Sequence, residues 1–216
     1  MSKIKTIEEI AMNFHDNQVM MIGGFMAAGT PEIFIDAIVE SGVKNLTVIS
    51  NDTAFVEIGI GRLIANRQIG KLIASHVGTN KETGRQMSAG EIEYELIPQG
   101  TLAERIRAAG AGLGGFLTPT GVGTIVEEGK QKLNIDGKEY LLELPLKAEI
   151  ALLHAWKADT YGNLVYRIVS RNFNPLMAMA ADLVVASAEE IVEVGELDPD
   201  AVVTPGALVD MLIKGR

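Results

Sequence analysis

The chain has 216 residues, a formal net charge of -9 and no cysteine. Its hydrophobic share of 47% and charged share of 22% are typical of a chain with a buried core, and we expect residues 1–216 to form a single domain. An acidic chain is a poor match for nucleic acid or an anionic membrane, so neither is expected as a partner. The missing cysteines exclude thiolate nucleophiles and disulfides, and three scattered histidines favour no metal site.

The sequence shows no pattern of a membrane or export segment. Glu8 and Glu9 interrupt the beginning of the chain, where an export signal would carry an apolar stretch. The longest apolar run, residues 19–28, has about ten residues, whereas a membrane helix needs about 20. We therefore expect a cytoplasmic protein.

The first predicted elements are a short helix and a buried strand. Residues 6–9 (TIEE) have the pattern of a capping box that opens a helix. Residues 19–22 are a continuous apolar run, which is typical of a strand covered on both faces. Residues 23–29 follow as a loop of small side chains.

A helix and a second strand complete a β-α-β unit. Thr30 is predicted to cap the helix, with Pro31 in its first turn, and Gly42 ends it. Residues 46–50 form the next apolar run. A strand, a loop, a helix and a second strand in this order predict a parallel sheet.

The rest of the chain continues this alternation. The remaining predicted elements are strands at 71–75 and 93–97, a helix at 101–109, a tight hairpin turn at Asp136-Gly137, a strand at 150–154, a helix at 174–181, a strand at 183–187 and a last helix from Thr204 to about Leu212. The predicted fold is α/β: a three-layer domain with a mainly parallel sheet and a β-hairpin insertion near residues 130–145. We find no internal repeat.

The glycine-containing loop at residues 23–29 is a candidate binding site. Glycine lets a ligand approach the backbone, and free N–H groups and a helix N-terminus favour a phosphate, carboxylate or thioester oxygen. The alternative is a tight turn that binds nothing. The loop does not have the spacing of a dinucleotide fingerprint, and the chain has neither a P-loop nor a G-x-S-x-G elbow.

Residues 16–31 (DNQVMMIGGFMAAGTP) meet every fixed position of a known signature: an acidic or amide start, three apolar residues, Gly-Gly-Phe, and a spaced Gly and Pro. This segment resembles class I CoA-transferases. The resemblance continues, in order, at residues 50–54 (SNDTA), 98–104 (PQGTLAE), 115–124 (GFLTPTGVGT), 171–175 (RNFNP) and 195–199 (GELDP). The sequence most closely resembles the α subunits of the 3-oxoacid group and, within this group, those of the acetate or butyrate–acetoacetate type. The resemblance implies a CoA-transferase-like fold.

The resemblance implies a CoA-transferase that works in two covalent stages. A glutamate takes up CoA as a glutamyl-CoA thioester and passes it to a second carboxylate, with ping-pong kinetics. In the family this glutamate lies in a Ser-Glu-Asn-Gly type motif on a β subunit, and this chain has no Glu-Asn-Gly. The expected partners are therefore a β subunit, in an α2β2 or larger assembly, together with acyl-CoA and short-chain carboxylates such as acetate, butyrate and acetoacetate. Coenzyme A is a substrate, and no permanently bound cofactor is expected.

The resemblance also implies site residues. The CoA-contacting loop comprises Gly23, Gly24, Phe25, Met26, Ala27, Ala28 and Gly29. Asn51 and Gln99, at the ends of predicted strands, match amides that support the reacting oxygens beside the glutamate, and their N–H groups suit an oxyanion. The alternative for both is a loop-capping side chain.

Other polar and glycine-rich features have simpler interpretations. Residues 114–124 form either a wall of the acyl pocket, a subunit contact or a structural turn. Arg167 and Arg171 are expected in ordinary salt bridges. The glutamates at 127–128 and 189–190 are expected on the solvated surface, and His76, His154 and Trp156 are expected to be structural.

Two alternative functions stay open from the residues alone. A sugar-phosphate isomerase or a ligand-sensing domain can occupy the same kind of α/β scaffold, because a fold does not fix a function. The chain can also be a pure assembly subunit that shapes a partner's pocket without touching substrate.

Overall fold

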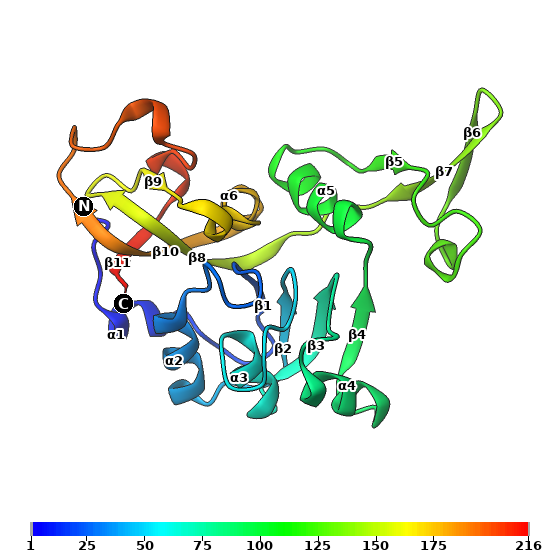
Figure 1. The fold of residues 1–216 in the computed structure, drawn as a ribbon, viewed down its shortest axis with the longest axis horizontal. Helices are drawn as coiled ribbons and strands as arrows, with labels where there is room; N and C mark the ends of the chain where they lie inside the picture. The colour runs from blue at the N-terminus through cyan, green and yellow to red at the C-terminus, as the bar shows by residue number, and fades with distance from the viewer. Residues whose placement is uncertain (1, 216) are drawn as a thin grey trace.

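A computed structural model describes residues 2–215 of the chain (Figure 1). Its centre is a sheet of seven parallel strands in the order β11-β10-β8-β1-β2-β3-β4. These strands are β1 (Val19–Ile22), β2 (Leu46–Ile49), β3 (Ile69–Ala74), β4 (Glu93–Leu96), β8 (Ala148–Asp159), β10 (Ala181–Val192) and β11 (Met211–Lys214). A two-residue strand, β9 (Leu164–Val165), pairs antiparallel with β8. The predicted parallel sheet is confirmed.

Helices cover both faces of this sheet. The helices are α1 (Ile7–Ala11), α2 (Glu32–Ser41), α3 (Ile60–Ala65), α4 (Lys81–Ser88), α5 (Gln99–Gly110) and α6 (Asn174–Met177). Short 3-10 turns lie at η1 (Ile125–Glu127), η2 (Ile168–Arg171), η3 (Pro199–Ala201) and η4 (Gly206–Leu208). The sequence analysis did not predict α3, which has only six residues, or α4, whose sequence KETGRQMS contains one large apolar side chain. None of the helices in residues 2–215 is long and apolar enough to cross a membrane.

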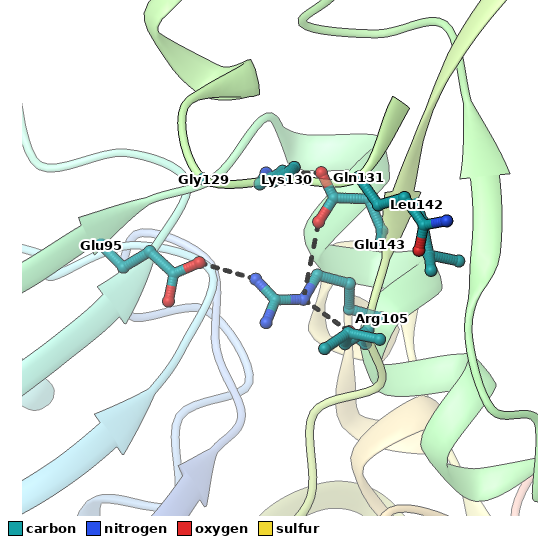
Figure 2. A pocket seen from close by; sticks show the side chains of 8 residues that line it. Glu95, Arg105, Gly129, Lys130, Gln131, Leu142 and Glu143 are labelled. Carbon is teal, nitrogen blue, oxygen red and sulfur yellow. Dashed lines mark hydrogen bonds and ion pairs between the residues drawn. The ribbon is translucent and has the colours of Figure 1, made fainter. Parts of the chain in front are cut away.

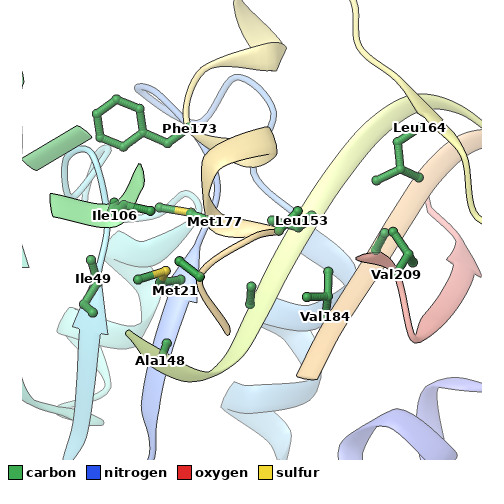
Figure 3. Close-up of a cluster of buried hydrophobic side chains, with 14 of the residues drawn as sticks. Met21, Ile49, Ile106, Ala148, Leu153, Leu164, Phe173, Met177, Val184 and Val209 are labelled. Carbon is green, nitrogen blue, oxygen red and sulfur yellow. The ribbon is translucent and has the colours of Figure 1, made fainter. Parts of the chain in front are cut away.

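The sheet separates two hydrophobic cores, because successive strand side chains point to opposite faces. Met20 and Ile22 pack with the side chains of α1, α2 and α3 in one core. Met21, between them, packs with Ile106 of α5 and Met177 of α6 in the other core (Figure 3). Both cores consist mainly of buried aliphatic side chains, so the three-layer α/β fold is confirmed.

The first turns of the fold follow the sequence signals closely, with one exception. Thr6 and Glu9 form the predicted capping box of α1, and Gly42 ends α2 in the left-handed conformation at φ 70°. Thr30 does not cap α2. The N-cap is Pro31, without a side-chain cap bond, and Thr30 is buried against the backbone of Gly24.

The predicted hairpin is present and is larger than expected. Strands β6 (Lys132–Ile135) and β7 (Lys138–Glu143) meet at Asp136 and Gly137, both at positive φ, as a tight hairpin turn requires. Strand β5 (Phe116–Thr118) adds a third strand along β7. In Figure 1 this small sheet projects from the parallel sheet next to α5.

An ionic cluster joins the projecting sheet to the rest of the fold (Figure 2). Glu143 on β7 is almost fully buried and lies 2.5 Å from the Lys130 ammonium and 3.9 Å from the Arg105 guanidinium. Arg105, from α5, also pairs with Glu95 at 2.7 Å. The four side chains line a cavity, and the two positive charges balance the two negative ones. We therefore interpret the cluster as a structural junction.

Two helix predictions near the end of the chain need correction. The helix predicted at 174–181 ends at Met177, and Ala181 already begins β10. The predicted last helix from Thr204 to Leu212 is wrong: a 3-10 turn at Gly206–Leu208 leads into strand β11. Pairing of β11 with the edge of β10 decides this outcome, since an apolar run of this length fits either structure.

Candidate functional site

Four segments of interest follow four neighbouring strands at the same edge of the sheet. Gly23 follows β1, Asn51 lies two residues beyond β2, Ser75 follows β3, and Gln99 is the first residue of α5, three residues beyond β4. The carboxyl ends of parallel strands gather at one edge, and Figure 1 shows these loops together there. β1 is also the point where the chain order reverses, since β2 lies on one side and β8 on the other. Such a switch point is where α/β folds bind ligands.

Ser75 joins the two predicted site amides. Its hydroxyl contacts the backbone oxygen of Asn51 at 2.7 Å and the side-chain oxygen of Asn51 at 3.4 Å. The same hydroxyl donates to the side-chain oxygen of Gln99. Within residues 2–215 no acceptor contacts the amide nitrogen of either Asn51 or Gln99. The structure therefore brings both predicted amides together and leaves both NH2 groups available as donors.

The sequence analysis missed Ser75, which it placed only as the last residue of a strand. Its position after a buried parallel strand was the available signal, because polar side chains at such positions face the ligand-binding edge.

The loop at residues 23–29 has fewer free N–H groups than the sequence analysis expected. Phe25 and Ala28 exchange backbone hydrogen bonds of 2.9 Å in both directions. The N–H of Gly24 donates to Asn172 at 3.1 Å, and that of Met26 donates to the carboxylate of Asp52 at 3.0 Å. In the described part of the chain, the loop N–H groups without an acceptor are those of Ala27 and Gly29.

The loop has a strained backbone and an exposed apolar surface. Met26 and Ala27 adopt left-handed φ angles of 48° and 73°, which residues other than glycine rarely adopt. Phe25 and Met26 are each 40% exposed. Strain of this kind persists where the surroundings fix the backbone, and it concentrates at functional sites.

The loop after β2 repeats this shape. Phe55 and Ile58 pair across a turn as Phe25 and Ala28 do, and Gly59 follows at φ 55°. Phe55 and Ile58 are also exposed, at 44% and 46%. The shared Phe-x-x-x-Gly spacing is a repeat that the sequence analysis overlooked. The two loops together present an apolar rim at the edge that holds the two amides.

The carboxylates near the site are engaged in hydrogen bonds or ion pairs within the fold. Asp52 is buried, and its two oxygens accept from the N–H groups of Met26 and Ala54 at 3.0 and 2.7 Å. Glu32 at the start of α2 is half-buried beside Arg62, and burial raises its pKa. The pairs of glutamates at 127–128 and 189–190 lie on other elements, and Glu128, Glu189 and Glu190 are exposed as predicted.

The remaining polar residues of the sequence analysis have different surroundings. Arg167 lies over the ring of Trp156, 5.6 Å from its centroid, and takes part in none of the ion pairs within residues 2–215, which corrects the salt-bridge prediction. His154 contacts the hydroxyl of Ser187 at 2.9 Å, and burial lowers its pKa despite the nearby Glu189. His76 is exposed. No group of three or more histidine and acidic side chains in residues 2–215 is arranged to hold a metal.

Comparison with known proteins agrees with this fold and with the order of the motifs. The family model described as coenzyme A transferase matches residues 4–215. The acetate CoA-transferase subunit alpha of Escherichia coli K12 is 57% identical over 215 residues, which are 100% of this chain and 98% of the relative. The acetoacetyl-CoA:acetate/butyrate CoA transferase alpha subunit of Clostridium acetobutylicum is 50% identical over 213 residues, covering 99% and 98%.

A solved structure extends the similarity to the fold. The acyl-CoA transferase YdiF of E. coli O157:H7, in a thioester complex with CoA, superposes with a TM-score of 0.87 at 21% identity. The superposition covers 99% of this chain and 49% of that one.

An α/β fold with its polar groups at the switch point, together with a family model that covers nearly the whole chain, defines the class: the chain belongs to the coenzyme A transferase family. Within it, the chain is a class I subunit of the α type. The resemblance drawn from the sequence motifs is confirmed.

Proposed function

We propose that this chain, together with a β subunit, moves CoA between a short-chain acyl-CoA and a carboxylate such as acetate, butyrate or acetoacetate. The names of the two relatives, an acetate and an acetoacetyl-CoA:acetate/butyrate CoA transferase, support this substrate class. The isomerase and ligand-sensing alternatives have no comparable support.

The reaction proceeds through a glutamate of the β subunit. Its carboxylate attacks the thioester carbon and the C–S bond breaks, giving an acyl–glutamyl anhydride and the CoA thiolate. The thiolate attacks the glutamyl carbonyl, releases the acyl group as a carboxylate and leaves a glutamyl-CoA thioester. A second carboxylate then takes the CoA by the reverse steps, so the kinetics are ping-pong.

The observation that carries this proposal is the pair of amides at Asn51 and Gln99. Each tetrahedral intermediate develops an oxyanion, and N–H donors held in advance stabilise it. The Ser75 hydroxyl has one hydrogen, which it donates to the side-chain oxygen of Gln99, and the side-chain oxygen of Asn51 lies 3.4 Å from it. Neither amide nitrogen has an acceptor within residues 2–215, so both NH2 groups are available for that oxyanion.

The glycine loop is the proposed CoA-contacting segment. Residues 23–29 lie at the same edge as the amides, and the N–H groups of Ala27 and Gly29 have no acceptor within residues 2–215, so they can donate to a ligand. Asp52 is a poor nucleophile, because both of its oxygens accept backbone hydrogen bonds. In line with the family resemblance and the absence of Glu-Asn-Gly from the sequence, the proposal assigns the nucleophile to the partner, in an α2β2 or larger assembly. In this proposal residues 1–216 act as one domain, and a cytoplasmic location stays a prediction.

Reconstitution tests the proposal. The chain is purified alone and with a partner subunit that carries a Ser-Glu-Asn-Gly motif, and transfer of CoA from acetyl-CoA to butyrate and to acetoacetate is measured. We expect negligible transfer by the chain alone and ping-pong kinetics for the complex. Strong activity of the chain alone, or a complex that transfers no CoA, would refute it.

A further inference from the structure

The glycine loop is held from outside by side chains that lie about 150 residues further along the chain. Asn172 and Asn174 reach it from the segment between η2 and α6. Asp52 holds it from the other side through the N–H of Met26. The loop thus takes its shape from contacts with two distant segments as well as from its own turn.

Asn172 uses both ends of its amide on this loop. Its side-chain oxygen accepts from the N–H of Gly24 at 3.1 Å, and its nitrogen donates to the backbone oxygen of Ala28 at 3.1 Å. One side chain therefore bridges the start and the end of the loop. Between these two points lie Met26 and Ala27, the residues with left-handed backbones.

Asn172 is itself strained. Its φ of 25° and ψ of -122° lie outside the favoured regions for a side-chain-bearing residue. Its own amide stabilises this conformation, since the backbone oxygens of Val169 and Ser170 lie 3.1 and 3.0 Å from the nitrogen and share its two hydrogens with Ala28. A strained residue that links two segments is typical of a position where geometry matters for function.

Asn174 is the second asparagine side chain that binds the glycine loop. It is fully buried, donates to the backbone oxygen of Gly29 at 3.2 Å and accepts from the N–H of His154 at 3.2 Å. A Cβ on Gly23 would stand only 1.9 Å from the side-chain oxygen of Asn174, so only glycine at position 23 leaves room for Asn174 beside the loop. Because Asn174 also ties strand β8, its replacement disturbs the fold, and Asn172 is the better residue to test.

We propose that Asn172 is a positioning residue that holds the glycine loop in the conformation that receives CoA. This inference rests on the proposed function of the loop. Binding is strongest when a site is already in its bound shape, because less ordering free energy is lost. Without the bridge, the loop relaxes toward unstrained conformations and the N–H groups of Ala27 and Gly29 lose their common orientation.

The test compares Asn172→Ala and Asn172→Gly in the complex with the β subunit. The glycine variant removes the same side chain but accepts the positive φ without strain, so it keeps the inference testable if the alanine variant folds poorly. The matched control is Asn66→Ala, an exposed asparagine at the end of α3. Assembly and melting temperature are checked for each variant before kinetics.

We expect the KM for acetyl-CoA to rise about tenfold in both Asn172 variants, with kcat within about twofold. The KM for the accepting carboxylate and the kinetics of Asn66→Ala are expected to stay unchanged. A purely structural role would reduce the active fraction and hence kcat, leaving the KM for acetyl-CoA as in the wild type. That result overturns the inference, whereas a wild-type complex without CoA transfer refutes the proposed function itself.

Discussion

Ser75 donates its hydroxyl hydrogen bond to the side-chain oxygen of Gln99, and this contact fixes which end of the Gln99 amide faces outward. The same hydroxyl lies 2.7 Å from the backbone oxygen of Asn51 and 3.4 Å from its side-chain oxygen, so one serine at the end of β3 keeps the amides of the two neighbouring segments together. Two donors aligned in this way, before any ligand arrives, are what stabilisation of an oxyanion requires.

The orienting role of Ser75 predicts a kinetic effect without a folding effect. Ser75→Ala should lower the kcat of the reconstituted complex about tenfold, because the amides lose a neutral hydrogen bond worth about 1 kcal/mol or slightly more. Ser75→Thr retains the hydroxyl and should restore most of the activity. Ser88→Ala, at an exposed serine in α4, is the control. Equal kcat values for Ser75→Ala and the control would exclude the orienting role.

The amides themselves should matter more than the serine. Asn51→Ala and Gln99→Ala should each lower kcat about 100-fold or more, as expected for loss of an oxyanion donor, with small changes in KM. The exposed amides of Asn66 and Gln131 provide matched alanine controls. If both site variants stay within about twofold of the wild type, the chain is an assembly subunit that touches no reacting atom.

Glycine at position 23 is required by space, and glycine at position 84 is not. A Cβ at Gly23 would overlap the side-chain oxygen of Asn174, so Gly23→Ala should destabilise the chain by about 1–3 kcal/mol. Gly84 lies in α4 with nothing near a Cβ, and Gly84→Ala should stabilise the chain by about 0.5–1 kcal/mol. Thermal unfolding measures both, and shifts of the same sign would contradict the packing described for the loop.

His154 should make the chain less stable in mild acid. Burial lowers its pKa in the folded state, so the unfolded state binds the proton more tightly. Stability therefore falls as the pH drops through the usual pKa range of histidine. His154→Gln should reduce the loss of stability between about pH 7.5 and about pH 5.5 in urea unfolding, compared with the wild type. An unchanged loss in His154→Gln would contradict this assignment.

Local sequence patterns predict much of this fold, because the local and the tertiary preferences agree. The apolar run at Val19–Ile22, the capping box at Thr6 and the Asp136-Gly137 turn are each stable for the reason the pattern suggests. The last helix fails because residues 204–212 have no local preference strong enough to resist pairing with β10. There the edge of an existing sheet, a tertiary feature, decides the structure.

The candidate site is only half visible in the sequence. Asn51, Gln99 and the glycine loop come from recognisable motifs, and their positions at strand ends follow from the alternation of elements. Ser75 does not, since a serine after a strand is an ordinary residue until the fold brings it to its partners. Asn172 lies in the motif at residues 171–175, but nothing in that motif indicates that its side chain contacts the glycine loop. The contact between Gly24 and Asn172 spans 148 residues, beyond any local pattern.

The central claim is that this chain supplies the amides and the CoA-contacting loop, and that the partner supplies the nucleophile. The most direct measurement is the intact mass of both subunits after the complex is incubated with acetyl-CoA without an acceptor and quenched in acid. The account predicts a CoA adduct on the β subunit and an unmodified mass for this chain. A CoA adduct on this chain would contradict it.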